Sequence, residues 1–131
     1  MCLLHLISSF VLIIEPENKK TDKYQLMVNS SIQFMKQHVD SNLSTAELAS
    51  NASLSVSHFS STFKRITGVS AMAYFNQLKM NKACDYLKYS DTLVKEISYK
   101  LGIYDVQYFS RLFVKTIGIT PLKYRKRHKS I

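Results

Sequence analysis

The sequence has few of the residues that build disulfide frameworks, metal centres and active sites. Its two cysteines, Cys2 and Cys84, lie far apart and show no CxxC or Cys/His ligand spacing. That excludes a disulfide framework and a zinc site and favours buried or free thiols in a reducing cytosol. The four histidines are scattered, and no HExxH motif, GxSxG elbow or glycine-rich phosphate loop occurs. We therefore expect neither an enzyme nor a protein that holds a metal or cofactor.

Acidic residues are also scarce, with nine Asp and Glu against eighteen Lys and Arg, so the net charge is +9. The imbalance is confined to residues 45–131, which hold fourteen of the basic and five of the acidic residues. A basic region of this kind attracts the phosphates of duplex DNA and releases their counterions. A membrane surface is the less favoured partner, because the region has no basic amphipathic helix with a broad exposed apolar face.

A pattern of aromatic, polar and glycine residues occurs twice in the chain, once in Phe59–Gly68 and again fifty residues later in Phe109–Gly118. Further upstream the matched residues, such as Leu48 with Ile97 and Leu54 with Ile103, lie forty-nine positions apart. One inserted residue therefore separates two copies of a duplicated structural unit. With 131 residues and 46% hydrophobic content, the chain is long enough for one globular domain or two small subdomains.

Each copy has the order helix, tight turn, helix. In the second copy Val94, Ile97 and Leu101 recur at helical spacing, and Gly102 follows as the turn residue, because glycine adopts a positive φ at little cost. In the first copy Ser53 stands where glycine would be easier. Ser44 or Thr45 is placed to cap that copy's first helix, with Glu47 in its first turn, while Gly68 and Gly118 end the second helices.

The second helix of each copy has an aromatic face and a polar face. Phe59, Phe63, Phe109 and Phe113 recur at helical spacing and are predicted to be core. The opposite face is polar and basic in both copies, with Ser57, His58, Ser60, Ser61, Lys64 and Arg65 matched by Gln107, Tyr108, Ser110, Arg111 and Lys115. One such face is typical of an ordinary solvated helix, but its repetition in two basic helix-turn-helix units favours DNA binding.

A helix is predicted from about Ala71 to Lys88 as a connection between the copies. We expect four regions: residues 1–20 as an apolar segment and linker, 21–70 as the first helix-turn-helix subdomain, 71–88 as the connecting helix and 89–131 as the second subdomain. The connecting helix carries the stem of Lys79 within its apolar rhythm. Pro121 fits the first turn of a further helix.

From about Lys23 to Arg127 the chain resembles the C-terminal DNA-binding domain of AraC/XylS-type transcriptional regulators. The second copy carries the more specific match, in the segments Ile97–Ile103, Tyr108–Phe113 and Gly118–Arg125. The resemblance implies an all-α fold of about seven helices, with two helix-turn-helix subdomains joined by a long helix. It also implies a regulator, usually an activator, that inserts two recognition helices into successive major-groove segments of promoter DNA and contacts RNA polymerase.

Carried over by position, the resemblance assigns two sets of DNA contacts. The residues expected to face bases are Ser57, Ser60, Ser61, Gln107, Ser110 and Arg111, and those expected to face phosphates are Lys64, Arg65, Lys115 and Arg125. Arg111 is the strongest single candidate, because its planar fork can pair with guanine O6 and N7. Ser61 stands where many members of the family have arginine. Serine discriminates poorly between bases, so sequence selectivity is expected to depend mainly on the second unit.

The first fourteen residues, Met1–Ile14, form a short apolar run, and a polar stretch to Lys20 follows as a linker. The run is short for a membrane span and lacks a basic n-region and a small-residue cleavage site, so a signal peptide or anchor is the less favoured interpretation. It resembles the stub of a dimerisation helix, which predicts a homodimer through Leu3, Leu6, Phe10 and Ile13. The sequence leaves open whether the chain is a fragment of a longer regulator or a stand-alone protein.

Two other functions also fit the sequence. A helical interaction module could keep the fold while its serine-rich first face has lost useful base readout. A nonspecific binder of nucleic acid or anionic membrane could depend on the net charge of +9 alone.

Overall fold

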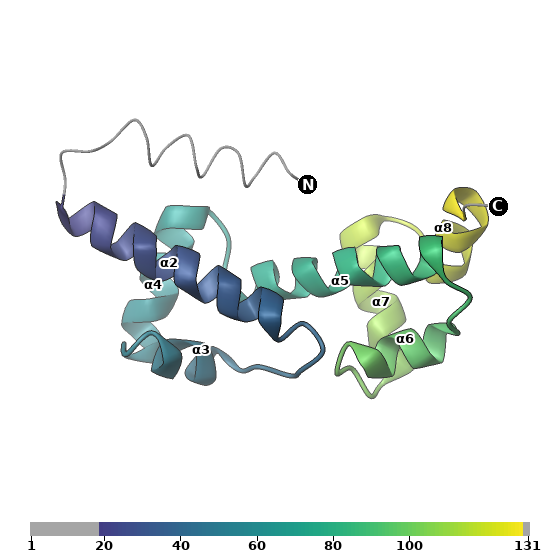
Figure 1. The fold of residues 1–131 in the computed structure, drawn as a ribbon, viewed down its shortest axis with the longest axis horizontal. Coiled ribbons are helices and arrows are strands. Elements are labelled where there is room, and N and C mark those ends of the chain that lie inside the picture. Colours follow the sequence, from purple (N-terminus) through teal and green to yellow (C-terminus); the bar gives the residue numbers. More distant parts are fainter. Residues whose placement is uncertain (1–18, 130–131) are drawn as a thin grey trace. The chain divides into compact units, whose positions relative to one another are not determined.

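The computed structural model describes residues 19–129, with side chains from Lys23 onward, and these residues form seven α-helices and no strand. The all-α fold expected from the sequence is therefore confirmed. The predicted apolar N-terminal segment and its dimerisation residues lie outside the described residues. In the labels of Figure 1 the helices are α2 (Lys19–Gln37), α3 (Thr45–Asn51), α4 (Val56–Thr67), α5 (Ala71–Tyr89), α6 (Val94–Lys100), α7 (Val106–Ile117) and α8 (Pro121–His128).

The chain divides into two compact units. Among the described residues, unit 1 contains those from 19 to 34 together with Ser44–Ala71, and unit 2 contains Met35–Leu43 together with those from 72 to 129. The helix expected at about Ala71 to Lys88 is present as α5, but from Met72 onward it belongs to unit 2. The expected linker also ends earlier than residue 20, because α2 already begins at Lys19.

Unit 1 is built from α2, α3 and α4. Helix α3 begins at the N-cap Ser44, whose side chain accepts from the backbone N–H of Glu47 at 3.1 Å, while the Glu47 carboxylate accepts from the Ser44 N–H at 3.2 Å. This reciprocal pair satisfies two amides that the first turn of a helix leaves without partners. Helix α3 packs against α4, and Phe59 and Phe63 of α4 are fully buried.

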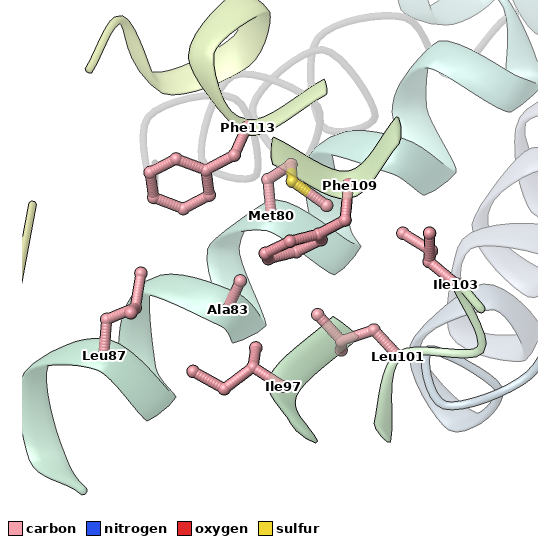
Figure 2. Close-up of a cluster of buried hydrophobic side chains, with 8 residues drawn as sticks. All are labelled: Met80, Ala83, Leu87, Ile97, Leu101, Ile103, Phe109 and Phe113. Atoms are coloured by element: carbon pink, nitrogen blue, oxygen red, sulfur yellow. The ribbon is translucent and has the colours of Figure 1, made fainter. Parts of the chain in front are cut away.

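Unit 2 has a core formed by α5, α6, α7 and the turn between α6 and α7. Figure 2 shows its side chains converging, with Phe109 near the centre of the group. Phe109 and Phe113 are fully buried, as the sequence predicts, and their ring centroids lie 6.1 Å apart. The other members of the cluster are Met80, Ala83, Leu87, Ile97, Leu101 and Ile103. Burying apolar side chains at about 25 cal/mol per Å² is the main stabilising contribution in such a core.

The turns of the two helix-turn-helix units close in the same way. The Leu54 N–H donates to the Ala49 carbonyl at 2.9 Å, and the Ile103 N–H donates to the Ser98 carbonyl at the same distance. Each turn contains one left-handed residue, Ser53 at φ 58° in unit 1 and Gly102 at φ 74° in unit 2. The prediction that Ser53 occupies a glycine-like position is confirmed.

Gly102 has a second constraint that the sequence does not reveal. A Cβ atom at this position would lie 3.0 Å from the backbone carbon of Ser41 and 3.2 Å from the carbonyl oxygen of Asp40. Both neighbours are backbone atoms, which cannot rotate away as a flexible side chain would. Unit 2 therefore needs glycine here for space as well as for its positive φ.

Lys79 also contacts the segment that approaches Gly102. It is 2% exposed, although the sequence predicts burial of its alkyl stem alone. Its Nζ atom donates to the carbonyl oxygens of Val39 at 2.8 Å and Ser41 at 2.5 Å and to that of Leu101. Burial lowers the pKa of Lys79 to about 8, and the nearby Asp40 carboxylate opposes this shift.

Candidate nucleic-acid interface

Helix α4 presents a polar face to solvent on the side opposite its buried aromatic rings. Its N-cap Ser55 accepts from the His58 N–H at 3.1 Å, and its C-cap is Gly68 at φ 87°. Among the residues expected to contact DNA, Ser60 is half-buried and Ser57, Ser61, Lys64 and Arg65 are exposed. The Ser61 hydroxyl donates to the His58 carbonyl at 3.3 Å, so its proton is directed to the helix backbone and its oxygen remains available as an acceptor.

Helix α7 repeats this construction in unit 2. Asp105 caps it by accepting from the Tyr108 N–H at 3.1 Å, and Gly118 ends it at φ 103°. Ser110 is half-buried, while Gln107, Arg111 and Lys115 are exposed. The residues that the sequence groups on one face of each second helix thus share an accessible surface in the structure.

Three of these cations have no partner within the described part of the chain. The side chains of Lys64, Arg111 and Lys115 make no hydrogen bond or ion pair there. A cation that is not neutralised by its own protein keeps its full charge for an external anion. This arrangement suits contact with phosphate oxygens or base acceptors.

Arg65 is supported by a residue that the sequence does not single out. Its guanidinium carbon lies 5.7 Å from the ring centroid of Tyr24, which is on α2 of the same unit. The Tyr24 ring also meets His58 edge to face, with centroids 5.5 Å apart. Tyr24 therefore restricts two polar side chains of α4, and a cation over an aromatic face is held in place by the ring's quadrupole.

Arg125 is placed differently from the expected phosphate contact. Its Nε donates to the Leu87 carbonyl at 3.1 Å, and its Nη2 donates to those of Ser90 at 3.0 Å and Thr92 at 2.6 Å. These carbonyls lie at and just beyond the C-terminal end of α5, where backbone acceptors lack helical partners. Arg125 thus caps α5, and we propose that it has this structural role instead of the phosphate contact expected from the sequence.

Two further titratable side chains, those of Cys84 and Tyr124, have raised pKa values. Burial raises the pKa of the Cys84 thiol, and burial together with the Cys84 hydrogen bond raises that of Tyr124 to about 12. The Tyr124 ring packs edge to face on Phe113, with centroids 5.8 Å apart.

Among the residues that the structure describes, no group of three His, Cys, Asp or Glu side chains could hold a metal ion. No helix within 19–129 is long and apolar enough to cross a membrane.

The chain is similar to known regulatory proteins. Residues 48–127 match the model of a family described as a helix-turn-helix domain. The chain is 39% identical over 94 residues to the MmsAB operon regulatory protein of Pseudomonas aeruginosa, covering 72% of this chain and 31% of that protein. It therefore spans less than a third of that relative.

Two solved structures share the fold. One is a transcriptional regulator with an AraC-type DNA-binding domain from Chromobacterium violaceum, with a TM-score of 0.74 at 22% identity over 79% of this chain and 93% of that one. The other is the DNA-binding domain of AdpA in complex with a target DNA, with a TM-score of 0.73 at 21% identity over 76% and 90% of the two chains. These two likenesses show the shared fold. The family match over residues 48–127 shows that this chain belongs to the AraC-type helix-turn-helix domains.

Proposed function

We propose that this protein is a sequence-specific transcription regulator, acting as an activator, that inserts α4 and α7 into successive major-groove segments of promoter DNA. The observation that carries the proposal is the repeated construction of the two helices. Each is capped at both ends, is anchored by two buried phenylalanines and presents a basic polar face to solvent. A rigid helix with such a face is the element that reads base edges in helix-turn-helix proteins.

The similar proteins support this proposal. The Pseudomonas relative is named as an operon regulatory protein, and a relative from Bacillus subtilis is named as a transcriptional activator. AdpA, whose DNA-binding domain shares the fold, was solved with its target DNA. Activation would be an effect on transcription, so we also propose RNA polymerase as a partner and the cytoplasm as the working compartment.

We assign the contacts in two classes. The base-facing set is Ser57, Ser60 and Ser61 on α4 with Gln107, Ser110 and Arg111 on α7, and the phosphate-facing set is Lys64, Arg65 and Lys115. The Ser61 proton is engaged by the helix backbone, whereas the Arg111 guanidinium is free within the described residues. Selectivity should therefore depend more on α7 than on α4, because a bidentate arginine discriminates guanine and a serine acceptor does not.

A homodimer through the apolar N-terminal segment, with Leu3, Leu6, Phe10 and Ile13 in contact, remains part of the proposal. Sedimentation of the full chain over a range of concentrations tests it. A mass that rises from one to two chains supports the dimer, and a monomer at every concentration rejects it.

A second candidate is a helical interaction module that binds DNA or membrane without selectivity. The feature that favours it is the base-facing set of α4, Ser57, Ser60 and Ser61, in which no side chain can make a bidentate base contact. It predicts binding that depends on charge alone.

One set of salt-titrated binding measurements separates the two functions. The full chain is titrated with a duplex selected from random sequences, with a scrambled duplex of equal length and with anionic vesicles. The regulator should bind the selected duplex at least about a thousandfold more tightly than the scrambled one at physiological salt. Equal affinity for both duplexes, or preference for vesicles, would reject sequence-specific regulation.

A further inference from the structure

The two helix-turn-helix units differ in length by one residue, and the structure identifies that residue as Tyr104. Leu54 and Ile103 make the same turn hydrogen bond and are forty-nine positions apart, whereas the caps Ser55 and Asp105 are fifty apart. Tyr104 lies between Ile103 and Asp105 and has no counterpart in unit 1. Because both turns and both caps form with the same bonds, the insertion is not required to build the motif.

Tyr104 is also the most exposed of the large apolar side chains that the structure describes, at 75%. An aromatic ring left in water contributes little to folding, since the hydrophobic gain comes from area removed from water. A tyrosine presents an apolar ring and a hydroxyl that can donate and accept, which suits a surface that is partly apolar and partly polar. Tyr104 therefore has the properties of a contact residue rather than a core residue.

The ring of Tyr104 is held in place by its own unit. Its centroid lies 5.8 Å from that of Tyr99 on α6, and the Lys95 Nζ atom lies 5.8 Å from the Tyr99 ring. Tyr99 is itself 42% exposed. The three side chains form a partly ordered group at the surface. Tyr104 therefore loses less side-chain entropy when it binds a partner than an isolated exposed ring would lose.

The position along the chain indicates what this group would meet. Tyr104 directly precedes the N-cap of α7, and Gln107 and Arg111, which we assign to bases, lie in the first turns of that helix. When the N-terminal residues of a recognition helix reach base edges, the segment that leads into it passes close to the sugar-phosphate backbone at the edge of the groove. That backbone offers an apolar deoxyribose face and phosphate oxygens that accept hydrogen bonds.

We propose that Tyr104 fastens unit 2 to DNA by packing its ring against a deoxyribose and donating its hydroxyl to a phosphate, with Tyr99 as its positioning residue. This inference rests on the proposed DNA binding and adds a contact of a different kind from the assigned ones. The contact is neutral and independent of base sequence. Unit 1, which lacks the inserted residue, has no equivalent of it.

The test compares Tyr104→Ala, Tyr104→Phe and Tyr99→Ala with the wild type by fluorescence anisotropy on the selected and scrambled duplexes. Tyr89→Ala is the matched control, because Tyr89 is an exposed tyrosine of the same unit, at 67%, on α5. Circular dichroism and a thermal melt of each variant establish that it is folded. Because Tyr104 is exposed, its replacement should leave the melting temperature close to that of the wild type.

Tyr104→Ala should weaken binding to both duplexes by a similar factor, roughly fivefold or more, the equivalent of one lost hydrogen bond with its ring contact. Tyr104→Phe should lose part of that affinity, and Tyr99→Ala should lose less than Tyr104→Ala. The salt dependence should not change, because tyrosine neutralises no phosphate. Tyr89→Ala should bind as the wild type does.

Two results would overturn the inference. One is a Tyr104→Ala variant that binds every duplex as tightly as the control, which would show that Tyr104 makes no contact with DNA. The other is a loss confined to the selected duplex, which would make Tyr104 a base reader. Failure of the proposed function looks different: the wild type itself would bind both duplexes equally, and the backbone contact of Tyr104 would still be measurable on either.

Discussion

The Nζ atom of Lys79, on α5, donates a hydrogen bond of 2.5 Å to the carbonyl oxygen of Ser41. Ser41 belongs to the segment between α2 and α3, which by its contacts is part of unit 2. The same ammonium also donates to the Val39 and Leu101 carbonyls. One buried lysine thus ties three separate stretches of the chain together at the turn of the second helix-turn-helix unit.

Replacing Lys79 by methionine should destabilise the protein by about 2–4 kcal/mol, because three carbonyl oxygens lose their donor while the apolar volume stays similar. The measurement is urea denaturation followed by circular dichroism. Lys82→Met is the control, since Lys82 lies on the same helix but is exposed. Equal stability of the two variants would show that the hydrogen bonds of the Lys79 ammonium add nothing to the free energy of unfolding.

The same lysine predicts a pH dependence of stability. Its folded pKa of about 8 is lower than the ordinary 10.5, so between these values the unfolded chain binds a proton that the folded chain does not. The free energy of unfolding should therefore rise with pH from about 8 to 10.5, by at most about 1.4 kcal/mol per pH unit, and this gain is lost as the pH falls through 8. The quantity to measure is the difference between wild type and Lys79→Met at pH 7.5, 8.5 and 9.5. A difference that stays constant would contradict the lowered pKa.

Gly102→Ala should cost more stability than Gly118→Ala. Both glycines have positive φ, at 74° and 103°, but an added Cβ meets nothing within 4 Å at Gly118 and meets the Ser41 backbone at 3.0 Å at Gly102. Gly118→Ala should therefore show the conformational cost alone, roughly 1–2 kcal/mol. The additional loss of stability in Gly102→Ala, measured by thermal unfolding, gives the cost of placing a Cβ atom against the Ser41 backbone. If the two variants melt at the same temperature, the segment around Ser41 moves aside freely.

Arg125→Ala should lower stability by about 2 kcal/mol or more, because the end of α5 loses a charged donor shared by several carbonyls. Arg127→Ala, at an exposed position on the same helix, should change stability by less than about 0.5 kcal/mol. At a temperature where both variants are folded, the slope of log affinity against log salt should be unchanged for Arg125→Ala. A slope reduced by about one would instead show that Arg125 contacts a phosphate.

Arg111→Ala should cost on the order of 1–3 kcal/mol on the selected duplex and should relax selectivity at one base pair. Ser61→Ala should cost less, because the Ser61 proton is already engaged by the His58 carbonyl. Lys115→Ala should weaken both duplexes alike and reduce the salt slope by about one. The readout is the ratio of affinities for selected and scrambled duplexes. Similar losses of selectivity for Arg111→Ala and Ser61→Ala would reject the unequal division between α7 and α4.

Much of this protein could be predicted without its structure, because the information is local. The two offsets of the repeat, the spacing of Phe109 and Phe113 and the placement of Gly118 follow from helical periodicity and from the φ preference of glycine, which act over a few residues. The all-α fold, the two helix-turn-helix units and the polar faces of α4 and α7 follow from such rules.

The remaining features depend on residues that are far apart in the sequence. Lys79 and Ser41 are 38 positions apart, as are Arg125 and Leu87. Nothing in the pattern around Lys79 separates a lysine with a solvated ammonium from one whose ammonium is buried among carbonyls. Nor does the basic run of α8 separate Arg125, which caps another helix, from its exposed neighbours. Local periodicity thus determined the helices and their faces, whereas folding decided which charges satisfy the backbone and which remain for a partner, since a charge leaves water only where fixed acceptors replace its hydration.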